Sequence, residues 1–157
     1  MLDKAVETLL RMSKDSYIIP GDVVANVSDT NNCYHALLVL TQTGYSKIPV
    51  LNNKEQFCGF VSLAMVTKQM MESDRMNPDR LMKIPVSEIM ESDVAVVEDP
   101  NDLEQVLNRL INEPFLPVVN EDRIFTGIIT RREILKRVNF LAHNLEDHFQ
   151  VSENTDK

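Results

Sequence analysis

Hydrophobic positions in the first half of the chain alternate between helical and extended spacing. Apolar residues from Leu2 to Leu10 lie at helical spacing and predict a lead-in helix within residues 1–16, before a turn at Pro20-Gly21. The polar stretch at 52–55 has the length of a hairpin turn. The elements predicted after the lead-in helix are a strand over 23–27, a helix over 33–43, paired strands over 47–51 and 57–61, and a helix over 63–71.

The second half repeats this order of elements. A charged segment over 72–85 contains Asn77-Pro78 and predicts a connector with a turn of helix in it. After a short turn at 86–90, the predicted elements are a strand over 94–97, a helix over 103–111, paired strands over 115–119 and 124–129, and a helix over 134–142. Each half therefore reads strand, helix, strand, strand, helix, which is an α+β arrangement of the α/β class. Beyond about residue 148 the chain is polar, and we expect no fixed structure there.

The two halves also share a motif. Pro49 is followed ten residues later by Gly59 (59 − 49), and Pro117 by Gly127 at the same interval (127 − 117). Each glycine opens an apolar pair that a hydroxyl residue closes. An internal repeat on this scale predicts a duplicated unit, and a unit of roughly 60 residues is only marginally stable alone. We therefore expect the two units to share a core.

Composition excludes several classes of protein. The net charge of −8, from 16 basic and 24 acidic residues, disfavours a sequence-independent hold on nucleic acid or an anionic membrane. No run of eighteen apolar residues and no basic segment leading into an apolar one is present, so we expect a cytoplasmic protein. Cys33 and Cys58 do not form a Cys-x-x-Cys pair, which favours two reduced thiols.

The sequence offers no catalytic constellation. None of the three histidines stands near a serine or cysteine in a nucleophile motif. His143 and His148 are five residues apart and do not share a helical face, so a metal site with Asp147 is the weaker reading. We therefore predict no catalytic residue, no metal and no enzyme activity, and expect a binding module.

The doubled β-α-β-β-α order, the apolar-Pro-Val strands and the Gly-apolar-apolar-Ser/Thr segments resemble the cystathionine-β-synthase (CBS) domain pair. The resemblance implies two repeats packed with pseudo-two-fold symmetry into one Bateman-type module that senses adenine nucleotides without turnover. The domains it implies are a lead-in helix at 1–16, repeat 1 at 17–72, a connector at 73–85, repeat 2 at 86–142 and a polar tail at 143–157.

In that family a nucleotide site combines the Gly-x-Ser-x-x-Pro segment of one repeat with the Ser/Thr-x-x-Asp/Glu segment of the other. The first repeat supplies residues 44–49 in full and the second supplies 130–133 in full, so one cleft is intact. The opposite cleft would combine 112–117, which lacks the glycine and serine, with 62–65, where methionine replaces the acid. We expect that cleft to be empty or weak.

The resemblance assigns the base-binding side of the intact cleft to the first repeat. Val24 and Ala25 would offer backbone groups to an adenine edge, and Tyr45 and Ile48 would pack against the base. The alternative for Tyr45 is a core position with its hydroxyl at the surface. The ligand-binding residues implied in this repeat are Val24, Ala25, Tyr45, Ser46, Lys47, Ile48 and Pro49.

The second repeat would bind the sugar and the phosphates. Thr130 and Glu133 are placed to bond a ribose, and Arg131 and Arg132 would add their charge to the positive end of a helix, where phosphate is the expected counter-ion. The alternatives are a solvated arginine pair and an ordinary first-turn acid. Positive charge at a helix start opposes the helix dipole, so the arginines require another reason.

The resemblance is closer to one subgroup than to the fold in general. The runs Val-Val-Ala-Asn-Val and Thr130-Arg-Arg132 are similar to the small stand-alone CBS proteins of Gram-positive bacteria that bind cyclic di-AMP. That likeness implies a cyclic di-AMP receptor, without a cofactor, that controls a protein partner such as an alarmone synthetase. It also implies a homodimer. The alternative is a regulatory subunit of an enzyme or transporter that senses AMP, ADP or ATP.

Overall fold

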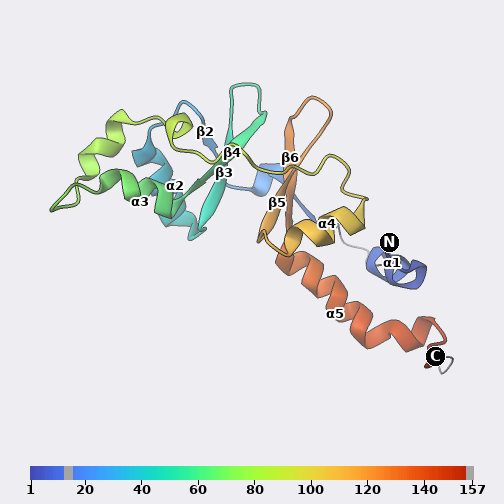
Figure 1. Ribbon diagram of the computed structural model, residues 1–157. Helices are drawn as coiled ribbons and strands as arrows, with labels where there is room; N and C mark the ends of the chain where they lie inside the picture. The colour runs from blue at the N-terminus through green and yellow to red at the C-terminus, as the bar shows by residue number, and fades with distance from the viewer. Residues whose placement is uncertain (13–15, 155–157) are drawn as a thin grey trace.

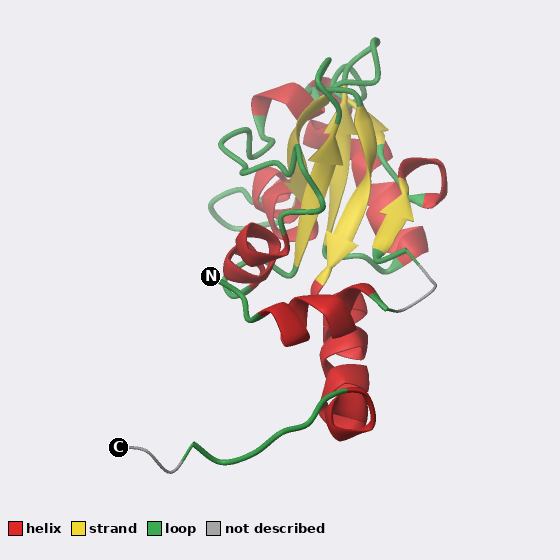
Figure 2. Cartoon of the chain, turned by 90° about the vertical axis from the view of Figure 1, so that its right-hand side faces the viewer, coloured by secondary structure: helices red, strands yellow, loops and turns green. Residues whose placement is uncertain are grey.

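Two three-stranded sheets lie side by side at the centre of the molecule (Figure 1). The computed structural model describes residues 1–12 and 16–154. One sheet has the strand order β2-β3-β4 and the other β1-β6-β5, with helices on their flanks (Figure 2). In chain order the elements of the first half are α1 Lys4–Arg11, β1 Ile18–Pro20, η1 Gly21–Val23, β2 Val27–Ser28, α2 Cys33–Thr43, β3 Lys47–Leu51, β4 Phe57–Ser62 and α3 Leu63–Met70.

The connector and second half complete the α+β fold that the sequence predicts. The expected turn of helix in the connector is a 3₁₀ helix, whose Leu81 is fully buried. The remaining elements are η2 Pro78–Lys83, η3 Val86–Glu88, α4 Leu103–Leu110, β5 Phe115–Val119, β6 Phe125–Thr130 and α5 Arg131–His148.

Both predicted hairpins are confirmed, and they have the same register. Lys47 pairs with Ser62 at the start of the first hairpin, and Phe115 pairs with Thr130 at the start of the second. Each ladder has a register shift directly after the valine of its Pro-Val pair. The shift lies between Val50 and Leu51 in the first hairpin and between Val118 and Val119 in the second. The sequence repeat is therefore a structural repeat.

Each half sends a segment across to the sheet of the other half. Strand β1 pairs antiparallel with β6, so that Ile19 lies opposite Ile128. In the reverse direction, Glu91 forms an antiparallel bridge with Phe60 of β4. This reciprocal exchange joins the two repeats through backbone hydrogen bonds, and the sequence analysis missed β1 entirely.

The exchanged segments explain why both repeats carry a glycine at the same place. A Cβ atom built on Gly127 would lie 2.4 Å from the carbonyl oxygen of Ile19, and one on Gly59 would lie 2.2 Å from that of Glu91. Real Cβ atoms do not approach an oxygen so closely. Only glycine therefore lets the crossing backbone lie against β6 in one sheet and against β4 in the other.

The predicted first strand of each repeat is largely wrong. Residues 21–23 form a 3₁₀ turn, and ladder pairing in the predicted segment 23–27 begins only at Val27, in β2. In the second half, over 94–97, only Val97 bridges a strand, opposite Val118. Runs of β-branched residues indicate an extended backbone, but they do not show that a neighbouring strand is available to pair with it.

The predicted helices are confirmed, but the lead-in helix covers only Lys4–Arg11, and the last helix begins at Arg131, before the predicted start at 134. Asn32 caps α2 by accepting a hydrogen bond from the His35 N–H at 2.9 Å, and Gly44 ends the helix in the left-handed region at φ 70°. Helix α5 continues to His148, beyond the end predicted at 142, and residues 149–154 have no regular structure. No helix in the described ranges has the length and apolar character needed to cross a membrane.

The repeated hydroxyl residues are helix caps. The Ser62 hydroxyl accepts from the Met65 N–H at 3.1 Å at the start of α3, and the Thr130 hydroxyl accepts from the Glu133 N–H at 3.2 Å at the start of α5. The Gly-apolar-apolar-Ser/Thr segment therefore encodes a strand that passes directly into a capped helix.

An aromatic cluster lies where the two halves meet. Phe57, Phe60 and Phe125 are buried there together with Val24 and Val119. The rings of Phe57 and Phe60 meet edge to face at 5.1 Å between centroids. Each half also has its own apolar core. The aromatic cluster contains residues of both halves, and it is the common core that the sequence predicts.

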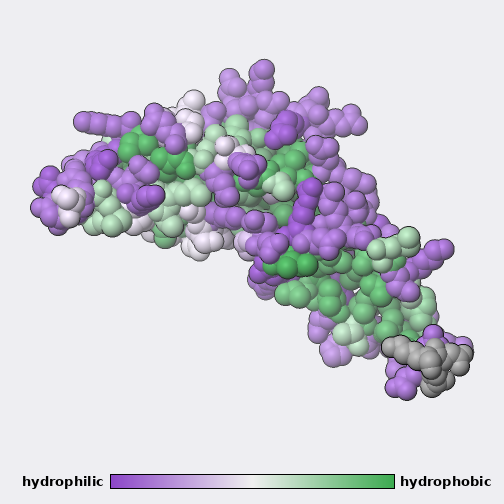
Figure 3. Space-filling view, in the orientation of Figure 1, coloured by the Kyte–Doolittle hydropathy of each residue, from purple (hydrophilic) through white to green (hydrophobic). Residues whose placement is uncertain are grey.

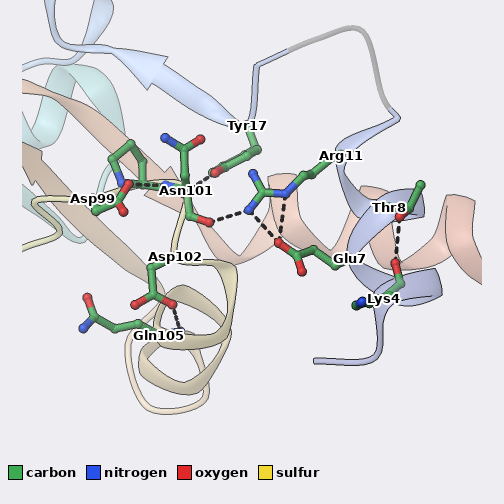
Figure 4. Close-up of polar contacts among 10 residues, drawn as sticks. Lys4, Glu7, Thr8, Arg11, Tyr17, Asp99, Asn101, Asp102 and Gln105 are labelled. Atoms are coloured by element: carbon green, nitrogen blue, oxygen red, sulfur yellow. Dashed lines mark hydrogen bonds and ion pairs between the residues drawn. The ribbon is translucent and has the colours of Figure 1, made fainter. Parts of the chain in front are cut away.

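The lead-in segment is fastened to the second half (Figure 4). The Arg11 guanidinium donates to the Asn101 carbonyl and at 2.9 Å to the Glu7 carboxylate, and the Tyr17 hydroxyl donates to the Pro100 carbonyl. On the α5 side, the buried Arg137 donates to a carbonyl of α1 at 2.8 Å. Residues 13–15 of the predicted lead-in helix lie outside the described residues.

Candidate functional site

A cleft of about 200 Å³ opens between the two halves, next to the aromatic cluster. We call it the first cleft. Most of the residues that the sequence predicts for the intact site line it, and they come from the extended segment after η1, from the entry to β3 and from the end of β6. These residues are Val24, Ala25, Tyr45, Ser46, Lys47, Ile48, Pro49 and Thr130.

The wall of the first cleft that the sequence analysis missed is apolar. Phe115 and Ile128 belong to the second hairpin, and Ile19 belongs to the crossing strand β1. Val23 adds a further apolar side chain at the end of η1. Ile19 could not be found without knowing that β1 crosses to the other half. Phe115 does have a sequence signal, because it begins the strand that repeats the predicted base-binding segment.

Polar groups are concentrated at the mouth of the first cleft. The side chain of Tyr45 is 53% exposed, so the alternative of a core tyrosine is wrong. Ser46 is also exposed, whereas Ile48 is buried at the inner end.

The Val24 N–H donates to the Gly21 carbonyl at 3.2 Å, and the Val24 carbonyl accepts from the Asn26 side-chain amide at 3.1 Å. The peptide groups of Val24 are therefore already engaged.

Arg131, Arg132 and Glu133 are the predicted site residues that do not line the first cleft. The Arg131 guanidinium donates to the carbonyls of Leu110 and Ile111 at 2.9 and 3.3 Å and so satisfies the end of α4. The Glu133 carboxylate accepts from the Lys136 ammonium at 2.8 Å. These contacts give Arg131 a structural reason to stand at a helix start, which sequence reasoning could not supply.

Within residues 1–12 and 16–154, no group of three His, Cys, Asp or Glu side chains is arranged to hold a metal ion. Both thiols are free, and burial raises the pKa of Cys33 to about 11, with a smaller contribution from Glu88. Burial also raises the pKa of Cys58. Protonated thiols are poor nucleophiles and poor metal ligands.

The second repeat matches a known family. The family model described as CBS domain matches residues 86–139. Cyclic di-AMP receptor B of Bacillus subtilis (strain 168) is 34% identical over 139 residues, which make up 88% of this chain and 95% of that protein.

Solved structures give the same result for the whole chain. The Listeria monocytogenes CbpB protein, crystallised in complex with c-di-AMP, has a TM-score of 0.75 and 41% identity, and the match covers 80% of this chain and 94% of that chain. CbpB from Streptococcus agalactiae has a TM-score of 0.84 and 27% identity, and the match covers 98% of this chain and 96% of that one. The chain therefore belongs to the CBS-domain family, in the group that includes cyclic di-AMP receptor B.

Proposed function

We propose that this protein is a non-catalytic receptor for cyclic di-AMP. The observation that carries the proposal is the preformed apolar cleft at the place where the motif residues of the two repeats converge. Relatives support the choice of ligand, because one is named cyclic di-AMP receptor B and another was crystallised with c-di-AMP.

The apolar walls of the first cleft suit an adenine ring. One base would lie between Ile48 on the first repeat and Phe115 and Ile128 on the second, and such a contact contributes about 1–3 kcal/mol per base. Because the peptide groups of Val24 are engaged within the protein, Ala25 is the residue whose backbone would read the adenine edge. Its small side chain leaves room for the ring.

The size of the first cleft fits half of the dinucleotide. Sites that enclose a whole drug-sized ligand measure about 300–1,000 Å³, which exceeds the 200 Å³ found here. The second adenosine would therefore lie at the mouth, near the exposed Tyr45. Thr130 would bond the ribose together with Glu133. Arg131 and Arg132 would bind the phosphodiesters, and Arg131 would exchange a carbonyl of α4 for a phosphate oxygen.

The bound state would act by changing contacts with other proteins. The resemblance to the stand-alone CBS proteins points to a regulated partner such as an alarmone synthetase. For self-association we propose the face formed by α4 and α5, where hydrophobic side chains gather in Figure 3. Ile111, Leu135 and Val138 are exposed there and line a groove, as expected for a symmetric homodimer.

Isothermal titration calorimetry with a panel of nucleotides tests the proposal. The wild-type protein should bind cyclic di-AMP more tightly than AMP, ADP or ATP, and it should reject cyclic di-GMP because the guanine edge presents donors and acceptors in a different order. Equal or tighter binding of cyclic di-GMP would overturn the assignment.

A further inference from the structure

The repeat implies a second position related to the first cleft, which we call the second cleft, and its facing residues follow from an offset of 68 positions. Tyr45, at the mouth of the first cleft, corresponds to Glu113 (45 + 68), and Phe115, on its wall, corresponds to Lys47 (115 − 68). The aromatic pair that flanks the first cleft is therefore replaced in the second cleft by a pair of opposite charges.

These two charged side chains meet in the structure. The Lys47 ammonium lies 3.4 Å from a carboxylate oxygen of Glu113. It also lies 4.8 Å from the centroid of the Phe60 ring and 5.2 Å from that of Phe115. The Lys47 side chain is only 17% exposed. The cation–π contacts with two rings and the ion pair with a carboxylate both stabilise the ammonium in this position relative to water.

A backbone carbonyl of the second cleft is also engaged in a hydrogen bond within the protein. Val96 corresponds to Ala25 when the repeats are aligned on Asp22 and Asp93. The Arg109 guanidinium donates to the carbonyl of Val96, so this carbonyl already has a charged donor. A base entering the second cleft would therefore have to displace Lys47 and would meet a carbonyl that is already engaged.

We infer that the Lys47–Glu113 ion pair closes the second cleft to nucleotides and so limits each chain to one ligand. The inference rests on the proposed function. The two clefts thus differ in specificity, because the charged Lys47 and Glu113 side chains oppose nucleotide binding in the second cleft and not in the first. Lys47 also lines the first cleft.

Calorimetric titration with cyclic di-AMP tests the inference by counting ligands per chain. The wild type should bind about one, whereas Glu113→Ala, which removes the carboxylate beside the Lys47 ammonium and leaves the lining of the first cleft intact, should bind about two, with the added site weaker than the first. The matched control is Glu72→Ala/Arg75→Ala, which removes an ion pair of 2.8 Å away from both clefts and should leave the count at about one.

The outcomes separate the inference from the proposed function. A wild type that binds no cyclic di-AMP overturns the proposed function and the inference with it. A wild type that binds one ligand, with a Glu113→Ala variant that also binds only one, overturns the inference alone. If Glu113→Ala does not fold, Glu113→Gln replaces it, because this change removes the charge and keeps the shape of the side chain. The Glu113 side chain is 49% exposed, and loss of its charge frees the Lys47 ammonium, so a weak second site should appear in either variant.

Discussion

Gly59 and Gly127 show how single residues determine the way the repeats join. Each lies under a carbonyl of the crossing segment at a distance that no Cβ atom tolerates. The repeat made both glycines visible in the sequence, but the reason for them lies in backbone that comes from the other half. From sequence alone, a glycine that is required because backbone of the other half packs against it cannot be distinguished from a glycine that is required in a turn.

Alanine at these positions should therefore destabilise the protein more than alanine at an ordinary turn glycine. Gly59→Ala and Gly127→Ala are each expected to lower the free energy of unfolding by about 2 kcal/mol or more, because the crossing backbone must move. Chemical denaturation measures the change. Gly44→Ala is the matched control, since Gly44 has φ 70° and nothing within 4 Å of the added methyl. It should cost about 1 kcal/mol, and a larger loss at Gly44 than at Gly59 would contradict this account.

Arg131 has one role in the ligand-free structure and a different one in the proposed complex. Its guanidinium bonds the end of α4, and it follows Thr130, which lines the first cleft. Sequence reasoning predicted the phosphate role from charge at a helix start and could not predict the carbonyl contacts, which depend on how α4 and α5 pack.

Arg131→Ala should weaken cyclic di-AMP binding by about 1–3 kcal/mol, or roughly 5- to 150-fold, through loss of a charge-assisted bond. Calorimetry measures the affinity, and thermal unfolding shows how much the lost contact with α4 affects stability. Arg131→Lys keeps the charge without the fork and should give an intermediate affinity. Unchanged affinity in Arg131→Ala would remove this residue from the site.

At the scale of elements, local signals predicted the hairpins and helices, and long-range pairing caused the errors. The hairpins follow from alternating strands around polar turns, and α2 follows from its Asn32 cap and Gly44 end. By contrast, β1 depends on β6, which lies more than a hundred residues away in the chain. The segment after η1 remains extended but outside the strand ladder over most of its length, and we propose that the backbone of Ala25, next to the engaged peptide groups of Val24, faces the ligand in the first cleft.

The two hairpin tips share an uncommon backbone conformation. Glu55 and Arg123 have φ of 61° and 62°, and each donates its N–H at 3.0 Å to the asparagine that begins the turn. The tips are also bonded to each other, since the Phe125 N–H donates to the Glu55 carbonyl at 2.9 Å. Glycine and asparagine are the residues that suit this left-handed position.

Glu55→Gly should therefore stabilise the protein by about 1 kcal/mol, because the left-handed strain of an ordinary residue is relieved and the backbone bonds stay. A rise in the denaturation midpoint would show it. Lys54→Gly, one residue earlier and outside the left-handed region, should give no gain. A destabilised Glu55→Gly would mean that the Glu55 side chain matters more than its backbone.

At the scale of the whole molecule, the duplicated chain has two related clefts with different contents. The first cleft has apolar walls and an open mouth, whereas the second holds Lys47 and Glu113. The motif comparison predicted this asymmetry from missing residues. It did not predict that Lys47, which it assigned to the first cleft, forms an ion pair with Glu113, because that contact depends on how the halves face each other.

A crystal structure of the protein grown with cyclic di-AMP tests the central claim most directly. The account predicts one ligand per chain, with an adenine against Ala25, Ile48 and Phe115 and the phosphates toward Arg131. Electron density for the dinucleotide beside Ser62–Met65, with the first cleft empty, would contradict the account.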